Sequence, residues 1–293
     1  MRVSDKMFYD LATKNSLDAR ERVLEASQEA ATGRRVTSPG DDPSAAGLIV
    51  KDRSQIMRLD AISQGAGRAN DELSVADSNL QQLTNVVGRA RELAEQLSND
   101  SYSAAERGNA VAEVQTLFNQ ALSLMNVDFN GRYVFGGTKD NGPPFDAAGN
   151  YSGDTNVRQI EVAPGVLEDS SIRADVAVKG VGGGTDLFAT LNALSTALGA
   201  NDGNGIRAAF DSLDGVNKQV GNALAKVGAS MDAFEAAQSI ASSAKLTTTK
   251  TLSNEQDADV FEASSKLALA NHALDATLTA SAASFRMSLV DKL

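Results

Sequence analysis

Residues 59–97 read LDAISQGAGRANDELSVADSNLQQLTNVVGRARELAEQL. Steps that alternate between three and four residues from Leu59 meet an apolar residue at every position, ending at Leu97. This spacing places one narrow apolar stripe along a helix, and such a stripe is typical of the seam between two packed helices. The stretch therefore predicts a long helix that needs a helical partner, because the stripe cannot be buried by one helix alone.

A partner stripe lies far downstream. The same stepping from Ile206 to Lys245 meets nine apolar residues, so we expect a second long helix that packs on the first. A further helix is predicted from about Ala104, because Ser103 and Glu106 have the spacing of a capping box. The apolar stripe of that helix consists of Val111, Val114, Phe118, Ala121 and Met125.

The middle of the chain has a different character. The segment Gly131–Gly184 contains 11 of the 24 glycines and 3 of the 5 prolines. Alternation of apolar and polar residues predicts strands at 158–162 and 172–178. A glycine-rich link, 182–184, then leads into a helix that starts near Asp186. We expect a small antiparallel β-domain inserted between the helical halves.

Both ends of the chain predict amphipathic helices, at 3–31 and 253–290, whose stripes are incomplete. Ser264, Asn271 and Ser281 stand where apolar residues would be expected. Helices of this kind are marginal alone and gain stability when packed on further chains. The candidate assembly interface consists of Val3, Met7, Phe8, Leu11, Leu17, Leu24, Val260, Leu267, Leu274, Leu278, Phe285 and Leu289.

These patterns predict a mainly α fold with a β-rich insertion, in which the long N- and C-terminal helices pack as a coiled-coil-like stalk. Three parts are expected, and two of them are discontinuous in sequence. Residues 1–45 plus 253–293 form a terminal helical assembly domain. Residues 46–130 plus 186–252 form a helical bundle domain, and residues 131–185 form the β-rich domain.

The composition argues against several classes of function. With 27 Lys and Arg against 38 Asp and Glu, the net charge is −11, which disfavours nucleic acid as a partner. The chain has no Cys, one His and no Trp, and aromatic residues make up 5%. We therefore expect no catalytic, cofactor-binding or metal site and no enzymatic activity. No stretch has the roughly 20 apolar residues of a membrane span.

Three motifs have both a chemical and a structural interpretation. Asp41 and Asp42 could act as a carboxylate pair, but a turn and helix cap before Pro43 is the preferred interpretation. The triglycine 182–184 lacks the Lys of a phosphate-binding loop. The set Asp140, Asp146, Asn150 and Asp154 lacks the spacing of a calcium loop, so turn chemistry is expected there.

The N-terminus, MRVSDKMFYD, has charges at four of its ten positions and no apolar core of a signal peptide. We therefore expect either a cytosolic protein or export by a route that does not read a cleavable signal.

Several motifs resemble the flagellin superfamily. The segment 33–47, GRRVTSPGDDPSAAG, is similar to the family's link after the first helix, and its Asp41-Asp42-Pro43 version resembles the hook-associated protein three family of FlgL type. The segment 131–138, GRYVFGGT, is also similar to that family, with Tyr133, Phe135, Gly136 and Gly137 as its motif residues. The opening MRVS, the segment 89–96 and the ending SLVDKL add to the resemblance.

The resemblance implies a structural junction protein of the bacterial flagellum, exported through the flagellar type III channel to the extracellular filament. It implies four partners: like subunits in a ring, a neighbouring hook-associated protein, flagellin and an export chaperone. Arg91 and Glu113 match family surface positions, so they are candidate contacts with the next subunit or with a flagellin-sensing receptor. The alternative is a filament flagellin, while a hydrolase on a coiled stalk is disfavoured because no constellation of catalytic residues is visible.

Overall fold

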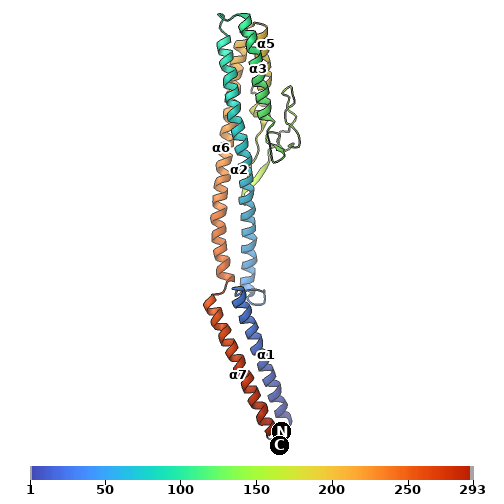
Figure 1. Ribbon diagram of the computed structural model, residues 1–293, viewed down its shortest axis with the longest axis vertical. Helices are drawn as coiled ribbons and strands as arrows, with labels where there is room; N and C mark the ends of the chain where they lie inside the picture. Colours follow the sequence, from blue (N-terminus) through green and yellow to red (C-terminus); the bar gives the residue numbers. More distant parts are fainter. Residues whose placement is uncertain (1, 291–293) are drawn as a thin grey trace. The chain divides into compact units, whose positions relative to one another are not determined.

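The structure, a computed structural model, describes the backbone of residues 2–290 and the side chains of residues 6–283 except residue 8. Long helices dominate these residues, and two small antiparallel sheets lie in the middle of the sequence (Figure 1). This confirms the predicted fold class. The elements in chain order are α1 (Arg2–Thr32), α2 (Pro43–Leu97), α3 (Ala104–Met125), β1 (Asp128–Phe129), β2 (Arg132–Tyr133), β3 (Gln159–Ala163), β4 (Val166–Asp169), α4 (Ala174–Ala177), α5 (Leu187–Gly199), α6 (Gly203–Gln256) and α7 (Val260–Val290).

The chain divides into two compact units, which are described separately. The first unit contains residues 1–58 and 244–293, and the second contains residues 59–243. The helices α2 and α6 each contribute residues to both units. The expected three-part division, with its separate β-rich domain at 131–185, stays a prediction.

The core of the second unit is the seam that the stretch 59–97 predicts. All stripe positions of α2 from Ile62 to Leu97 are buried, and Leu59 is half-buried. The α6 stripe joins the same core through Leu213, Val220 and Phe234. Gln238, a polar interruption of this stripe, is half-buried, and its Nε2 donates a hydrogen bond to the Ser63 carbonyl at 3.3 Å. The two halves of the chain therefore pack together as expected.

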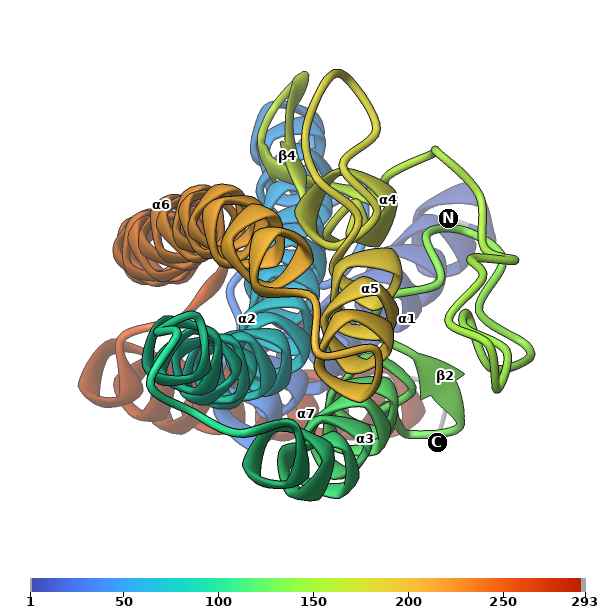
Figure 2. The ribbon, with the colours of Figure 1, turned by 90° about the horizontal axis from the view of Figure 1, so that it is seen from above.

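Helices α3 and α5 begin at the residues that the sequence predicts. Ser103 accepts a hydrogen bond from the Glu106 N–H, and the Glu106 carboxylate accepts one from the Ser103 N–H at 2.8 Å. Asp186 caps α5 by accepting from the Ala189 N–H at 3.1 Å. The two helices lie side by side (Figure 2), and Phe118 meets Phe188 edge-to-face with ring centroids 5.2 Å apart.

The inserted segment contains two hairpins rather than one continuous sheet. Strands β1 and β2 are joined by Asn130 and Gly131, both with positive φ, as a two-residue turn of type I′ requires. Strands β3 and β4 pair antiparallel, with Gln159 opposite Asp169 and Ala163 opposite Val166. Polar contacts fix the second hairpin on α6: Lys226 pairs with Asp169 at 2.8 Å, and the Ser230 hydroxyl donates to Glu168 at 2.8 Å.

The hairpin β3–β4 is also fixed to α2. Arg158, just before β3, forms ion pairs with Glu72 of α2 and with Asp140, the latter at 2.5 Å. Burial raises the pKa of Glu72, although the neighbouring Arg158 acts in the opposite direction. The insertion is therefore held by charged groups that are themselves largely shielded from solvent.

One predicted strand and one predicted helix boundary are wrong. Residues 172–178 contain the short helix α4 instead of a strand, because Ala174, Ala177 and Val178 are buried at a helical spacing while Val176 is exposed. The C-terminal helix begins at Val260 and not at 253, since α6 continues to Gln256. Asp259 starts the new helix by accepting from the Phe261 N–H at 2.8 Å.

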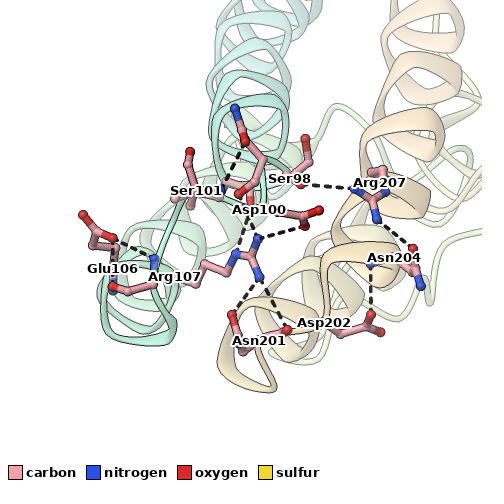
Figure 3. Close-up of polar contacts among 12 residues, drawn as sticks. Ser98, Asp100, Ser101, Glu106, Arg107, Asn201, Asp202, Asn204 and Arg207 are labelled. Atoms are coloured by element: carbon pink, nitrogen blue, oxygen red, sulfur yellow. Dashed lines mark hydrogen bonds and ion pairs between the residues drawn. The ribbon is translucent and has the colours of Figure 1, made fainter.

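A buried cation joins two turns at one end of the second unit (Figure 3). The guanidinium of Arg107 donates to the Leu97 carbonyl at 2.9 Å, to the Asn99 carbonyl at 3.0 Å and to Asn201 Oδ1 at 2.7 Å. Its side chain is 5% exposed, and the carboxylate of Asp100 lies 4.0 Å away. Arg107 thus ties the turn between α2 and α3 to the turn between α5 and α6, and it satisfies carbonyls that the end of α2 leaves open.

We expect Arg107→Met to lower the free energy of unfolding by about 3 kcal/mol, because it leaves buried carbonyl groups without donors. Chemical denaturation followed by circular dichroism measures the change. The neighbouring Arg207 is the matched control: it is exposed and bonds the Ser98 carbonyl at 3.3 Å. Arg207→Met should change stability by no more than about 0.5 kcal/mol. Equal losses in the two variants would contradict the role given to Arg107.

Candidate assembly interface

The terminal helices α1 and α7 lie side by side (Figure 1). Among the described side chains of this pair, the buried ones are Ala19 and Ala26 on α1 and Ala263 near the start of α7. One ion-pair network crosses the seam, because Lys266 Nζ lies 3.3 Å from Glu29 and 3.0 Å from Glu262. An alanine seam allows close approach of the two helices but buries little apolar area.

Most of the larger apolar side chains described in these helices are exposed. Leu24 is 69% exposed, and Phe261 is 86% exposed. Of the twelve predicted interface residues, Leu267 and Leu274 are half-buried. The side chains of Val3, Phe8, Phe285 and Leu289 lie outside the described residues. The exposed members of the set are Met7, Leu11, Leu17, Leu24, Val260 and Leu278.

Sequence reasoning missed three exposed apolar residues in the same helices: Tyr9, Phe261 and Leu269. Phe261 and Leu269 lie off the stripe that starts at Val260, so helical periodicity did not select them. A search for adjacent large apolar residues would have found Phe261, which directly follows Val260. The outward apolar surface is therefore larger than the predicted stripe.

The link 33–42 closes the first unit by bonding to the turn between α6 and α7. Gly33 ends α1 with a φ of 63°, and its carbonyl accepts from the Ala258 N–H at 2.9 Å. The guanidinium of Arg35 donates to the Glu255 carbonyl at 2.8 Å. Val36 is buried against Ala45, Ile49 and Leu252. This segment, which resembles the family's link, therefore holds both terminal helices at one joint.

Asp41 and Asp42 shape the turn that starts α2. The Asp41 carboxylate accepts from the N–H groups of Thr37 and Ser38, both at 2.8 Å, and these bonds lower the pKa of Asp41 to about 2. Asp42 caps α2 by accepting from the Ala45 N–H at 3.0 Å, while Pro43 occupies the first helical position. The pair thus has the geometry of a turn and a cap, with each carboxylate occupied by backbone donors.

The motif 131–138 lies in the second unit and makes structural contacts. Phe135 is fully buried, and its carbonyl accepts from the Tyr151 hydroxyl at 3.2 Å. Burial raises the pKa of Tyr151 to about 12. Gly137 has a φ of 73°, and a side chain there would collide with Asp154. Tyr133 is half-buried in β2, and Gly136 passes close to the backbone of Lys139.

The structure separates Arg91 from Glu113 and gives each an intramolecular contact. The Arg91 guanidinium stacks 4.9 Å above the Phe210 ring and lies 3.6 Å from Asp214. Glu113 instead accepts from Arg89 Nε at 2.7 Å. Both side chains keep about two-fifths of their surface exposed, at 42% each. A role for them between subunits stays a prediction.

The residues weighed as a calcium loop do not converge. Asp146 accepts from the Asn150 N–H at 2.8 Å, Asp154 accepts from the Thr138 N–H at 2.8 Å, and Asp140 is paired with Arg158. Among the described residues, no three His, Cys, Asp or Glu side chains are grouped so that they could hold a metal ion. The triglycine leads to Asp186, which is paired with Lys179. None of the helices in the described part of the chain has the length and apolarity to cross a bilayer.

Residues 3–140 match the family described as the bacterial flagellin N-terminal helical region. The flagellar hook-associated protein 3 of Escherichia coli is 26% identical over 283 residues, which cover 88% of this chain and 89% of that protein. Its counterpart from Salmonella typhimurium is 30% identical over 162 residues, 54% of this chain and 51% of the relative. A weaker match is a flagellin of Listeria innocua, 27% identical over 82% of this chain and 80% of the relative.

Solved structures share the fold. A putative flagellar hook-associated protein from Vibrio parahaemolyticus gives a TM-score of 0.67 at 20% identity and covers 74% of this chain and 100% of that chain. FlgL from Xanthomonas campestris gives a TM-score of 0.62 at 19% identity, covering 69% of this chain and 99% of that one.

The chain is similar to members of the bacterial flagellin superfamily, through the N-terminal helical region and through the hook-associated protein 3 relatives. Within it, the hook-associated protein 3 relatives match more strongly than the flagellins, which confirms the resemblance to the FlgL type seen in the motifs.

In dilute solution we expect the backbone amides of residues 9–30 and 262–283 to exchange hydrogen faster than those of residues 62–97 and 206–241. The terminal pair is held by an alanine seam, whereas the second unit has a continuous core of large apolar side chains. Hydrogen exchange measured by mass spectrometry tests this. Equal protection of both sets in the isolated chain would show that the terminal helices need no further partner.

Proposed function

We propose that this chain is a structural junction subunit of the bacterial flagellum, which assembles with like subunits through α1 and α7. The observation that carries the proposal is the inverted arrangement of the terminal pair: the fully buried residues described there are alanines, while most of the leucines and Phe261 are exposed. Exposed apolar side chains of this kind contribute to stability only when another chain covers them.

The magnitude of this effect is large for a helix pair. Full burial of a Leu or Phe side chain contributes about 1.5–3 kcal/mol relative to its exposed state. Four side chains on α1 alone, Met7, Leu11, Leu17 and Leu24, are more than half exposed. Covering them in an assembly offsets the entropy lost when subunits associate.

The named relatives support the position of the subunit. Both hook-associated protein 3 relatives are flagellar by name, and we propose the same zone for this chain, between another hook-associated protein and flagellin. We propose a structural role and not an enzymatic one. We further propose export without a cleaved signal, with an export chaperone as an additional partner, and an extracellular site in the flagellum.

Expression of Leu24→Asp in a strain that lacks the native chain should leave hooks without filaments and release flagellin into the medium. The substitution places a charge where the proposed interface excludes water. Electron microscopy of cells and analysis of the medium measure the outcome. The control is Leu246→Asp on α6, which changes an equally exposed leucine of the first unit outside the terminal helices.

The control strain should carry filaments. Purified Leu24→Asp should retain the circular dichroism and melting curve of the second unit. Normal filaments on Leu24→Asp cells would overturn the proposal.

A filament flagellin is the second candidate, favoured by the match to the Listeria innocua flagellin over most of both chains. Abundance separates the two functions. A junction subunit should form a minor band in sheared filaments, detectable with an antibody but faint beside the filament protein. A dominant band of this chain would identify it as the filament subunit.

A further inference from the structure

Asparagine is followed directly by glycine at three places in the chain, at Asn130, Asn141 and Asn204. In such a pair the backbone nitrogen of the glycine can attack the side-chain carbonyl carbon of the asparagine, because no Cβ hinders its approach. The attack needs an asparagine side chain and a glycine N–H that are free of hydrogen bonds, and a backbone that can rotate between them. The surroundings of each pair therefore decide whether it reacts.

Asn141 and Gly142 meet these conditions. Asn141 is exposed in the irregular loop between β2 and β3, and among the described residues its side chain has no hydrogen-bond partner. The Gly142 N–H donates to no group in the described part of the chain. Apart from its chain neighbours, a Cβ at Gly142 would meet no atom within 4 Å. The backbone of this pair thus has open space in which to rotate.

The other two pairs are held by their surroundings. Asn130 and Gly131 both have positive φ in the turn between β1 and β2, so rotation of the backbone there would disrupt the pairing of the two strands. Asn204 lies in the first turn of α6, and its Oδ1 accepts from the Arg207 guanidinium at 2.8 Å. The helix fixes the backbone around Asn204, because its dihedral angles are confined to one narrow region.

We propose that the fold selects Asn141 as a site of spontaneous deamidation. The Gly142 nitrogen gives up its proton and bonds to Asn141 Cγ, while the Cγ–Nδ2 bond breaks and the side-chain nitrogen leaves as ammonia with that proton. One water molecule then opens the resulting succinimide ring. Attack of water at the side-chain carbonyl gives aspartate, and attack at the main-chain carbonyl gives isoaspartate. The sequence of steps needs water but no oxidant or reductant.

The loop is anchored on both sides of the reacting pair, so the product can form while the chain stays folded. The Asp140 carbonyl accepts from the Tyr133 N–H at 3.0 Å. On the other side, the Asn126 side chain bonds both the N–H and the carbonyl of Phe145, each at 2.9 Å. Deamidation adds one negative charge beside Asp140, whose carboxylate is paired with Arg158. Each chain would therefore acquire this charge with time after its synthesis.

Mass spectrometry of the aged chain tests the proposal. The purified full-length protein is incubated in mildly alkaline buffer and digested with trypsin. The three asparagines fall on separate tryptic peptides, 108–132, 140–158 and 180–207, and fragmentation locates the change within each. Asn141 should convert several-fold faster than Asn130 or Asn204. In concentrated urea the three rates should approach one another, because only the fold distinguishes pairs that all contain glycine.

Gly142→Ala is the matched variant. The added methyl group hinders attack by its own nitrogen, and the space around Gly142, whose φ lies outside the left-handed region, accommodates it. Conversion of Asn141 should fall several-fold, while the circular dichroism and the rate at Asn130 stay unchanged. Equal rates at the three asparagines of the folded chain would contradict the proposal, as would a preference for Asn141 that persists undiminished in urea. These outcomes do not depend on assembly, so the proposal can fail while the junction function stands.

Discussion

The seam between α1 and α7 is the constraint on which the functional argument depends. Alanine side chains at Ala19, Ala26 and Ala263 let the two helices approach closely but remove little apolar surface from water. Most of the larger apolar residues described in the pair therefore face solvent, while Leu267 and Leu274 are half-buried. In the second unit the reverse holds, because Leu73, Leu80 and Phe234 fill the space between α2 and α6. One chain thus contains a bundle with a core of large apolar side chains and a terminal pair that leaves most of such side chains exposed.

Much of the fold follows from local sequence patterns. The unbroken stripe at 59–97 identified the central seam because burial there depends on helical periodicity alone. The capping box at Ser103 and the cap at Asp186 fixed helix starts, since each needs a single side chain close in sequence. The segment 172–178 was misjudged because alanine and valine alternate with charges there, and the distinction depends on which residues the core of the second unit covers. Burial of Ala174 and Val178 is set by tertiary packing.

The sequence predicted some of the exposed apolar residues of the candidate interface and missed others. Periodicity selected Leu17 and Leu24, and both are exposed. It could not select Phe261, because that residue follows a helix break set by Asp259, and no Gly or Pro marks the break. The role of Arg107 could not be predicted from the sequence either. Its partners, the carbonyls of Leu97 and Asn99 and the amide of Asn201, come together only after both turns have formed.

The placement of the two chain ends in one unit has a mechanical consequence. Tension applied at either terminus acts first on the seam between α1 and α7. This seam has fewer large apolar contacts than the core of the second unit, so it resists separation less. The turns tied by Arg107 belong to the other unit and are among the last to part. A subunit pulled by one end would therefore unravel in a defined order, beginning with the terminal pair. On release, the same helices would be the last to refold, because fewer large apolar contacts hold them.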